Sequence, residues 1–572
     1  MMRILFLTHT FNSLSQRLYC ELVERGHRVS IEFDIADSVA EEAVALFRPD
    51  LIVAPYLRRA IPESIWKNHV CLIVHPGIVG DRGPSALDWA IQAQAPEWGV
   101  TVLQAEAEMD AGPIWAEARF PMRMAKKSSL YRNEVTEAAT RGVLQAVERF
   151  AAGNFVPTPL NYDDPAVKGR LRPLMRQADR AIDWARDTTA TVLAKINAAD
   201  GFPGIADTLF GQPCHLFDAC AEGVLKGASG ELIARRETAI CRATVDGAVW
   251  IGHVKRGDSA HPFKLPATLA FAEEAATLPE SALDGWWAPQ HATWQDIRYE
   301  EAQHVGFLHF DFTNGAMGTR QCERLLEAYR WATSRPTKVI VLMGGRDFWS
   351  NGIHLNLIEA AESPADESWA NINAIDDLAD AIISTGSHLT VAAVQGNTGA
   401  GGCFLARAAD FVWMRNGALM NPHYKNMGNL FGSEYWTYLL PPRVGEDGAR
   451  AIMQNRLPLT AKAGVANGFV DACLAADIDA FRVDVARRAA ELANAADLEE
   501  RLAAKRDRRA ADEAAKPLAK YRAEELDHMR RNFYGFDPSY HVARFHFVHK
   551  SPMSWTPRHL AQHRDLGWEI PA

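Results

Sequence analysis

Short apolar runs that alternate with helix-length segments occur twice in this chain, once in each half. In the first 120 residues, five such runs from RILFLT to GVTVLQ are separated by segments such as SLSQRLYCELVERG. From about residue 298, the runs VGFLHFDF, KVIVLMGG, LTVAAVQG and DFVWM repeat the pattern. Strands that alternate with helices form parallel sheets covered by those helices. The sequence therefore predicts two separate α/β domains.

The chain between and after these regions has a different pattern. Residues 150–175 are rich in proline, glycine and charge, which indicates a linker, and short β-like runs then continue to about residue 270. After residue 475 the composition shifts to Ala, Arg, Glu and Lys, which indicates a helical extension with solvated faces. At 572 residues the chain is too long for one core. The four expected parts are 1–155, 176–270, 285–490 and 491–572.

Composition and sequence pattern argue against several classes of partner. The formal net charge of −10 argues against nucleic-acid binding, and no apolar run approaches the roughly 20 residues of a membrane-spanning helix. The start MMRILFLTHTFN has no small-residue cleavage site and is expected to form a strand rather than a signal peptide. The eight cysteines are scattered without a CxxC spacing, which is typical of reduced thiols. We therefore expect a cytoplasmic protein that binds small molecules, with no nucleic acid and no membrane.

His75 stands at the end of the fourth apolar run, CLIVHP, where ligands bind in parallel sheets. It belongs to an ordered set of short motifs: HPG at 75–77, RGP at 82–84, WAI at 89–91, GVT at 99–101 and DAGPI at 110–114. Over residues 1–120 this set resembles the formyltetrahydrofolate-dependent formyltransferases and hydrolases. Beyond the linker, IDW at 182–184 and DGFPG at 200–204 are similar to the C-terminal domain of transfer-RNA formyltransferases.

The chemistry of formyl transfer explains these residue types. A formyl group that leaves N10 of a folate passes through a tetrahedral oxyanion, which needs a hydrogen-bond donor, and a carboxylate must relay protons. The resemblance implies that His75 is the donor, that Asp110 is the relay and that 10-formyltetrahydrofolate supplies the formyl group. Taken alone, His75 also fits a structural histidine at a strand end, and Asp110 fits a turn residue before a glycine.

One position departs from the formyltransferase pattern. The family usually carries an asparagine two residues before the histidine, where this chain has Ile73, whose side chain cannot donate a hydrogen bond. Either the group that accepts the formyl is a nucleophile that needs less activation than an amine, as a thiol is, or the domain binds folate without transferring the formyl group efficiently.

Two glycine-rich segments lie in the second α/β region, GGRDFWSNGIHLNLIEAA at 344–361 and VAAVQGNTGAGGCFLARAADFVW at 391–413. They resemble the two loops of the enoyl-CoA hydratase and isomerase superfamily, often called crotonases, and residues 440–474 match its later helices. The resemblance implies an acyl-CoA substrate whose thioester carbonyl is polarised by the backbone N–H groups of Ile353 and Gly401. In the alternative interpretation the glycines only permit tight turns.

The glutamates that hydratases use are missing from their places. One aligns with Phe404 and the next falls near His423 and Tyr424, so addition of water to an enoyl-CoA is not expected. Polar candidates for the chemistry are His423, Tyr424 and Glu434, the last in NLFGSEYW. In the alternative interpretation, Tyr424 is a core residue bonded to the backbone and Glu434 lies at the surface.

A formyltransferase-like half joined to a crotonase-like half suggests that one product, formyl-CoA, passes between them. Over its full length, including YHVARFHFVHK and TPRHLAQHR near its end, the chain resembles the HypX-type maturation factors of nickel-iron hydrogenases. This resemblance implies carbon monoxide synthesis for the hydrogenase iron, with folate and coenzyme A as small-molecule partners and hydrogenase maturation proteins as further partners. Formyl-CoA breaks to CO and CoA thiol if Tyr424 and Glu434 carry the formyl proton from carbon to sulfur.

The phosphates of coenzyme A call for arginines and helix-start N–H groups. The candidates are Gln16, Arg17, Arg132 and Arg456, each of which also fits an ordinary surface residue. Five histidines between residues 541 and 563 have no cysteine or carboxylate at ligand spacing, so no metal site is expected.

Two other functions remain open. One is a formyltransferase that acts on an amine and is fused to an unrelated acyl-CoA enzyme, and Ile73 weighs against it. The other is a non-catalytic scaffold that senses folate and CoA, and retention of His75, Asp110 and both glycine-rich loops weighs against it. The expected fold is a multidomain α/β protein with a formyltransferase-like parallel-sheet domain, a small β-rich domain, a crotonase-like α/β domain and a C-terminal helical extension.

Overall fold

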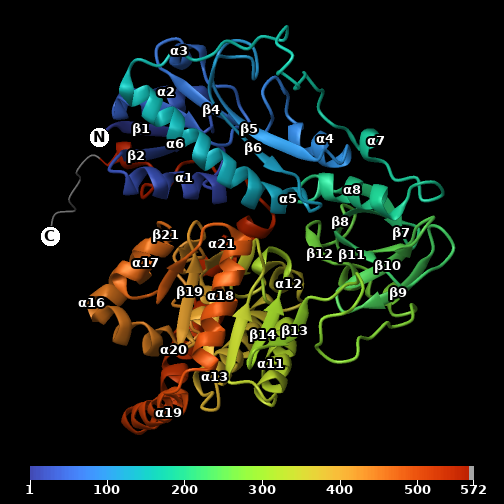
Figure 1. Ribbon diagram of the computed structural model, residues 1–572, viewed down its shortest axis with the longest axis vertical. Coiled ribbons are helices and arrows are strands. Elements are labelled where there is room, and N and C mark those ends of the chain that lie inside the picture. Colours follow the sequence, from blue (N-terminus) through green and yellow to red (C-terminus); the bar gives the residue numbers. More distant parts are fainter. Residues whose placement is uncertain (566–572) are drawn as a thin grey trace. The chain divides into compact units, whose positions relative to one another are not determined.

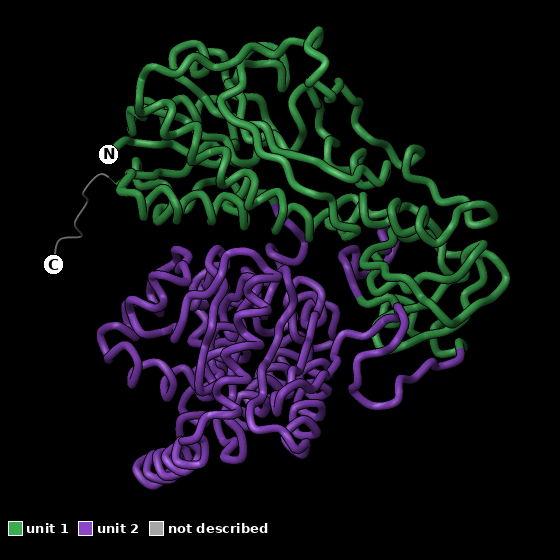
Figure 2. Tube along the Cα trace, viewed as in Figure 1, with its two compact units in different colours: residues 1–255, 266–278, 552–572 green, residues 256–265, 279–551 purple. Residues whose placement is uncertain are grey.

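The computed structural model describes residues 1–565, which divide into two compact units (Figures 1 and 2). The first unit contains residues 1–255, 266–278 and the described residues from 552 onward, and the second contains residues 256–265 and 279–551. The chain therefore leaves the first unit and returns to it more than once.

The first unit begins with a six-stranded sheet in the order β2-β1-β3-β4-β5-β6. Its strands are β1 (Arg3–Thr8), β2 (Arg28–Phe33), β3 (Leu51–Ala54), β4 (Cys71–His75), β5 (Glu97–Gln104) and β6 (Ile114–Pro121). Strands β1 to β4 pair in parallel, as expected. The run GVTVLQ, expected to continue the parallel sheet, lies in β5 and pairs antiparallel with β4 and β6. A loop without a helix joins β5 to β6, which accounts for the antiparallel pairing of these two strands. Strand β5 also runs antiparallel to β4, although α4 lies between them in the chain.

Short helices cover this sheet, and their ends follow local sequence signals. They are α1 (Ser13–Glu24), α2 (Asp37–Phe47), α3 (Glu63–Trp66), α4 (Ala86–Gln92), α5 (Lys127–Leu130) and α6 (Thr136–Ala152), with the π-helical turn η1 (Tyr131–Val135) before α6. Helix α1 starts after Asn12, whose side chain accepts a 3.0 Å hydrogen bond from the Ser15 N–H. Helix α6 ends at Gly153 in the left-handed conformation.

The small β-rich domain completes the first unit. Its antiparallel sheet runs in the order β7-β8-β11-β10-β9. The elements are α7 (Gln177–Arg180), α8 (Thr189–Ala199), β7 (Ile205–Leu209), β8 (Gln212–Glu222), β9 (Leu232–Arg236), β10 (Ala239–Ala243), β11 (Ala248–Lys255), β12 (Lys264–Pro266), α9 (Ala267–Ala270) and α10 (Ala272–Ala275). Helix α8 buries Val192 and Ile196 in the core of this sheet.

The second unit contains two sheets in the orders β13-β14-β15-β17-β19-β22 and β16-β18-β20-β21. The strands are β13 (Ile297–Ala302), β14 (Val305–Phe310), β15 (Val339–Met343), β16 (Phe348–Ser350), β17 (Leu389–Val394), β18 (Asn397–Gly399), β19 (Phe411–Arg415), β20 (Leu419–Asn421), β21 (Leu459–Thr460) and β22 (Ala472–Leu474). All pairs are parallel except β13 with β14 and β20 with β21.

Helices cover both faces of the larger sheet. The helices of this unit are α11 (Thr319–Thr333), α12 (Leu355–Ala360), α13 (Pro364–Ile383), α14 (Gly401–Arg407), α15 (Trp436–Leu439), α16 (Pro441–Gln454), α17 (Ala461–Asn467), α18 (Ile478–Ala493), α19 (Leu498–Ala515), α20 (Leu518–Tyr534) and α21 (Ser539–Val548). Alternate residues of β15 point to opposite faces: Val339 and Val341 pack in the cluster of α18 and α19, while Ile340 and Leu342 pack in the cluster of α11 and α13. Burial on both faces explains why this run is continuously apolar.

The C-terminal helices differ from a solvated extension. Leu526, Met529 and Phe533 of α20 and Tyr540 of α21 belong to the main core of the second unit. These side chains recur at helical spacing and form an apolar stripe within a charge-rich sequence. Helix α20 is therefore an integral part of the crotonase-like unit.

The residues after α21 also depart from a helical extension, because those from 552 to 565 return to the first unit. They cover β2, which forms one edge of the first sheet: the Ile31 N–H donates to the Leu560 carbonyl at 3.0 Å, and the Phe33 N–H donates to Thr556 Oγ1 at 2.9 Å. An edge strand exposes unpaired backbone groups, and this segment satisfies two of them.

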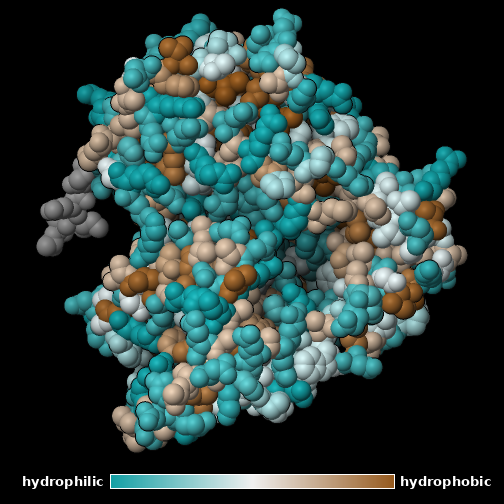
Figure 3. Space-filling model, in the orientation of Figure 1, coloured by the Kyte–Doolittle hydropathy of each residue, from teal (hydrophilic) through white to brown (hydrophobic). Residues whose placement is uncertain are grey.

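The visible surface is largely hydrophilic, with separate apolar groups rather than one continuous apolar band (Figure 3). Within residues 1–565, no helix combines the length and the apolar composition needed to cross a bilayer.

Candidate active sites

The first site is built at the end of β4, where His75 lies between two carboxylates. His75 Nε2 lies 3.3 Å from Asp81 Oδ1, and His75 Nδ1 lies 3.5 Å from Asp110 Oδ2. The His75 side chain is buried. The chain can turn beneath the ring only because residue 77 is glycine, since a Cβ there would lie 2.4 Å from His75 Nε2. The HPG motif therefore places the imidazole and clears the space beside it.

Asp110 is held by a second motif of the set. It adopts a left-handed backbone conformation, with φ of 54°, and its Oδ2 accepts a 3.0 Å hydrogen bond from the Gly83 N–H. Aspartate tolerates this conformation better than most residues. The structure thus brings together the two residues that the sequence singled out, with Asp110 12% exposed at the side chain and His75 5%.

Asp81 and Arg172 complete this site, and sequence reasoning missed both. Asp81 is buried, and its Oδ2 forms a 3.3 Å ion pair with Arg172 Nε. Because Asp81 contacts the ring nitrogen opposite to Asp110, it fixes the orientation of the imidazole. Asp81 directly precedes the RGP motif, and this position could have marked it as a site residue. Arg172 lies in the linker, where no motif indicated a role in the site.

Ile73 lies two residues before His75 on β4, on the same face of the strand. Its side chain packs against the apolar cluster of Leu5, Leu7 and Cys71. Formyltransferases usually have an asparagine at this position. The side chain of Ile73 is apolar and supplies no hydrogen-bond donor.

The second site lies between two loops of the crotonase-like unit. Ile353 follows β16 and pairs with Met317, and Gly401 is the first residue of α14. A Cβ built on Gly352 would lie 3.2 Å from the Gly401 backbone nitrogen, so the two loops are in direct contact. The first N–H groups of a helix have no intrahelical partner, which leaves Gly401 suited to bind an oxyanion.

Tyr424 and Glu434 meet at these loops. The Tyr424 hydroxyl donates a 2.6 Å hydrogen bond to Glu434 Oε2, and both side chains are buried. A Cβ on Gly401 would lie 1.9 Å from Glu434 Oε1, so only a glycine leaves room for the carboxyl group. The alternative of a surface glutamate is wrong, because Glu434 is 1% exposed.

Burial controls the protonation of both groups. Burial raises the pKa of Glu434, and the charge of Asp376 raises it further. Burial also raises the pKa of Tyr424 well above its usual range, with Glu434 adding to the shift. A proton is therefore held on this pair at neutral pH.

Phe404 and His423 stand at or near the positions that the crotonase resemblance aligns with the hydratase glutamates. Phe404 is buried and stacks on the Tyr424 ring, with ring centroids 5.8 Å apart and planes 18° apart. His423 is buried beside Tyr424 in the chain. The buried Phe404 ring therefore packs against Tyr424 and limits the positions that the tyrosine ring can take.

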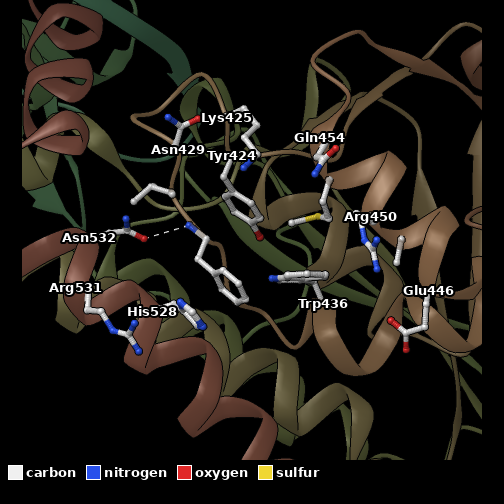
Figure 4. Close-up of a pocket in the computed structure, with 14 residues that line it drawn as sticks. Tyr424, Lys425, Asn429, Trp436, Glu446, Arg450, Gln454, His528, Arg531 and Asn532 are labelled. Carbon is white, nitrogen blue, oxygen red and sulfur yellow. Dashed lines mark hydrogen bonds between the residues drawn. The ribbon is translucent and has the colours of Figure 1, made fainter. Parts of the chain in front are cut away.

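Tyr424 also lines a cavity of about 410 Å³ within the second unit (Figure 4). Phe431 and His528 both line this cavity and stack directly on each other with ring centroids 4.1 Å apart. The Phe431 N–H donates to Asn532 Oδ1 at 3.1 Å (Figure 4). The cavity walls come from the loop before α15 and from α16 and α20. Tyr424 therefore contacts both the cavity and Glu434.

The four candidates for phosphate binding do not form one cluster within a unit. Gln16 lies in α1 and donates to the Phe11 carbonyl at 3.0 Å, and Arg132 lies in η1. Arg17 is buried and paired with Glu21 at 2.8 Å, which makes it unsuited to a phosphate. Arg456 belongs to the second unit and lies 3.4 Å from Asn429 Oδ1.

The C-terminal histidines make structural contacts. His541 Nε2 lies 2.9 Å from the Phe533 carbonyl, and His549 stacks on Phe545 with ring centroids 4.1 Å apart. His563 contacts Glu32 at 2.9 Å. No group of three or more metal-ligating side chains is assembled anywhere in residues 1–565.

Comparison with known proteins agrees with this division into two sites. Residues 29–147 match the formyl transferase family, residues 174–261 match its C-terminal domain, and residues 315–556 match the enoyl-CoA hydratase/isomerase family. Hydrogenase maturation factor HoxX of Bradyrhizobium diazoefficiens is 56% identical over 563 residues, which cover 98% of this chain and 97% of that protein. The chain belongs to the HoxX/HypX family of hydrogenase maturation factors.

Structural comparison supports the same family. A crystal structure of HypX from Aquifex aeolicus in complex with tetrahydrofolic acid matches this HoxX/HypX chain with a TM-score of 0.96 and 48% identity, covering 100% of both chains. The methionyl-tRNA formyltransferase of Roseiflexus castenholzii is 30% identical over 193 residues, 32% of this chain and 58% of that protein. The resemblance inferred from the sequence is confirmed at the level of the family and its two component domains.

Two acidic residues of the HoxX/HypX chain lie beside the second site and were missed from the sequence. They are Asp376 of α13 and Glu525 of α20, both buried. Glu525 stands in a charge-rich helical segment that predicts a solvated face, and Asp376 lies in α13 outside every motif that the sequence singled out. Only the packing of α13 and α20 around the loop before α15 places them at the site.

Proposed function

We propose that this chain synthesises carbon monoxide from 10-formyltetrahydrofolate, by formyl transfer to CoA and decarbonylation of formyl-CoA, for assembly of the nickel-iron hydrogenase active site. The observation that carries the proposal is the buried, hydrogen-bonded pair of Tyr424 and Glu434, in which the Glu434 carboxyl group lies against Gly401. The relative from Aquifex aeolicus, solved with tetrahydrofolic acid, supports a folate substrate for the first site.

In the first step, His75 donates a hydrogen bond to the oxyanion that forms when the CoA thiol attacks the formyl carbon. Asp110 takes the thiol proton and delivers it to N10 as the folate leaves. The bond from carbon to N10 breaks and the bond from carbon to sulfur forms, so the products are tetrahydrofolate and formyl-CoA. A thiol needs less activation than an amine, which is consistent with an apolar Ile73.

In the second step, the N–H groups of Ile353 and Gly401 hold the formyl oxygen. The pair of Tyr424 and Glu434 takes the formyl proton from carbon and supplies a proton to sulfur. The bond from carbon to sulfur breaks, its electrons stay on sulfur, and the products are CO and CoA thiol. No water takes part, which is consistent with the replacement of a hydratase glutamate by Phe404.

Coenzyme A is a substrate of the first step and a product of the second. Gln16 and Arg132, at the first helix and at η1 of the first unit, are the proposed contacts to its phosphates there, and Arg456 is proposed for the second unit. Arg17 is not carried forward, because Glu21 already neutralises it.

The alternative is a formyltransferase for an amine joined to an unrelated acyl-CoA enzyme. Supplying formyl-CoA directly distinguishes the two. We expect the parent and the Asp110→Asn variant to release CO from formyl-CoA at the same rate, while only the parent releases CO from 10-formyltetrahydrofolate and CoA. A parent protein that leaves formyl-CoA intact, or that consumes the folate at the same rate with and without CoA, supports the alternative.

A further inference from the structure

The turn that carries Glu434 has an unusual backbone. Glu434 and Tyr435 are consecutive non-glycine residues in the left-handed region, with φ of 56° and 59°. L-residues rarely adopt this conformation and keep it only where their surroundings hold them in place. The contacts around this turn therefore decide where the Glu434 carboxyl group points.

Asp376 of α13 holds the first half of the turn. Its Oδ1 accepts a 2.9 Å hydrogen bond from the Glu434 N–H, and its Oδ2 accepts a 2.8 Å hydrogen bond from the Ser433 hydroxyl. Asp376 is fully buried. One oxygen thus holds the Glu434 backbone N–H, and the other holds the side chain of the neighbouring Ser433.

Glu525 of α20 holds the second half. Its Oε2 accepts a 3.0 Å hydrogen bond from the Tyr435 N–H and lies 3.3 Å from the Ser433 hydroxyl. Its Oε1 accepts hydrogen bonds from the N–H and the hydroxyl of Thr437, at 2.8 Å and 2.5 Å. Two carboxylates from separate helices therefore secure both sides of one strained turn.

The charges around Glu434 are mostly of one sign. The Ser433 hydroxyl lies within hydrogen-bond distance of both Asp376 and Glu525. Asp376 also accepts the hydrogen bond from the Glu434 N–H. Arg522 of α20 is the nearby cation, but it lies 3.9 Å from Asp376 and pairs with Asp377 at 2.6 Å. The other titratable groups that interact with these carboxylates are Tyr424, Cys322, Tyr435 and Cys403, and Asp380 acts on Tyr435.

Three buried carboxyl groups in one network cannot all be ionised at neutral pH. Burial is the main cause that raises the pKa of Glu434, Asp376 and Glu525, the last to about 8. The charge of Asp376 raises the pKa of both glutamates further. Glu434 is the member that reaches Gly401, so its proton is the one that faces the substrate.

We propose that Asp376 and Glu525 are positioning residues that fix the Glu434 carboxyl group against Gly401 and keep it in its proton-bearing form, so that Glu434 begins each turnover as the acid. This inference rests on the proposed function. The Glu434 proton passes to sulfur as the bond from carbon to sulfur breaks. The resulting carboxylate takes the formyl proton, whose bonding electrons remain on carbon as the lone pair of CO. Glu434 ends the cycle protonated, and no other reactant is required.

The proposal is tested with Glu525→Gln and Asp376→Asn, which keep the size of each side chain and remove its negative charge. The matched control is Glu524→Gln, since Glu524 is the exposed neighbour of Glu525 on α20. Release of CO from formyl-CoA is measured against pH. The parent rate should fall at alkaline pH. This fall should move to lower pH by about one unit in either test variant, because the variant lacks the negative charge that the carboxyl group gains as pH rises.

Infrared titration gives a readout that does not need CO release. The carbonyl stretch of the protonated Glu434 carboxyl group is assigned by its loss in Glu434→Gln. It should persist to higher pH in the parent and in Glu524→Gln than in Glu525→Gln or Asp376→Asn. If one test variant fails to fold, the other still provides the comparison.

The outcomes separate this inference from the proposed function. An infrared band that behaves as expected in a protein that releases no CO overturns the proposed function and leaves the protonation of Glu434 established. A parent protein in which Glu434 is ionised throughout the neutral range overturns the inference. Test variants that release CO more slowly but with an unchanged pH profile also overturn the inference, because that result shows that Asp376 and Glu525 have a purely structural role.

Discussion

Tyr424 and Glu434 share a 2.6 Å hydrogen bond inside the crotonase-like unit, where the Glu434 carboxyl group also lies against Gly401. A short hydrogen bond between two buried groups lets a proton move between them without water. Hydratases need separate glutamates to activate water, whereas a decarbonylation needs one proton to leave carbon and one to reach sulfur. The pair therefore suits the decarbonylation that we propose.

The first prediction separates the two steps of the proposed function. Tyr424→Phe and Glu434→Gln should leave formyl-CoA formation intact and slow CO release by about 100- to 10,000-fold, the usual contribution of general acid–base groups. Formyl-CoA, or formate from its hydrolysis, should accumulate, as followed by chromatography. The double variant should be little worse than the worse single variant, because both groups serve one proton transfer. If both variants release CO at the parent rate, His423 or the loops alone carry the proton transfer.

The second prediction concerns Asp110. Asp110→Asn should keep the fold, since the amide can still accept the hydrogen bond from the Gly83 N–H, but it cannot relay a proton. We expect formyl transfer from the folate to fall at least about 100-fold. Glu106→Gln, an exposed carboxylate on the same loop, is the matched control and should be active. Normal folate turnover by Asp110→Asn would remove the residue from the mechanism.

The third prediction tests the space beside Gly401. Gly401→Ala should slow CO release from formyl-CoA by about 100- to 1,000-fold, because the new Cβ displaces the Glu434 carboxyl group and shifts an oxyanion donor. Gly257→Ala is the control, because a Cβ there meets no atom within 4 Å. A fully active Gly401→Ala variant would contradict the placement of the carbonyl at this loop.

The fourth prediction concerns stability in the first unit. Glu32 is buried and contacts His563, Arg564 and Thr556 of the C-terminal segment. Burial opposes ionisation of Glu32, but these hydrogen bonds outweigh it and lower its pKa. Glu32→Gln should therefore cost about 3 kcal/mol at neutral pH. Glu42→Gln removes only an exposed pair with Arg564 and should cost less than about 1 kcal/mol.

The pH dependence of this loss follows from the lowered pKa. The contribution of the Glu32 charge is fully present above its unfolded pKa of about 4.3 and disappears as pH falls through its folded value. Thermal unfolding should therefore show a gap between the parent and Glu32→Gln that is widest near neutral pH and narrows in acid. A gap that does not depend on pH would show that the carboxylate charge is not its source.

Local motifs were sufficient to nominate residues that the structure then brings together at each candidate site. His75 and Asp110 were found because each lies in a short motif beside the turn that positions it, and Ile353 and Gly401 because glycine-rich loops keep their spacing. Tyr424 and Glu434 were found by the absence of the hydratase glutamates. Their meeting in one hydrogen bond depends on packing and was not visible in the sequence.

Residues that act across long sequence distances escaped prediction. Glu525 lies in a charge-rich segment that indicates a solvated helix, yet the stripe of Leu526, Met529 and Phe533 buries one side of α20. The return of the segment after residue 552 to β2 leaves no local pattern, because its partner Glu32 lies more than 500 residues away. Arg17 was chosen for a phosphate, although Glu21 one helical turn later already indicated its partner.

The most direct test of the proposed function follows the formyl carbon itself. The purified protein is incubated with 10-formyltetrahydrofolate carrying an isotopically labelled formyl group, with and without CoA, and the gas is trapped on a haem protein. We expect labelled CO in equal amount to the formyl group consumed, only when CoA is present, with the CoA recovered unchanged. Label that appears as formate or on an amine without CO, or CO that forms equally well without CoA, would contradict the account.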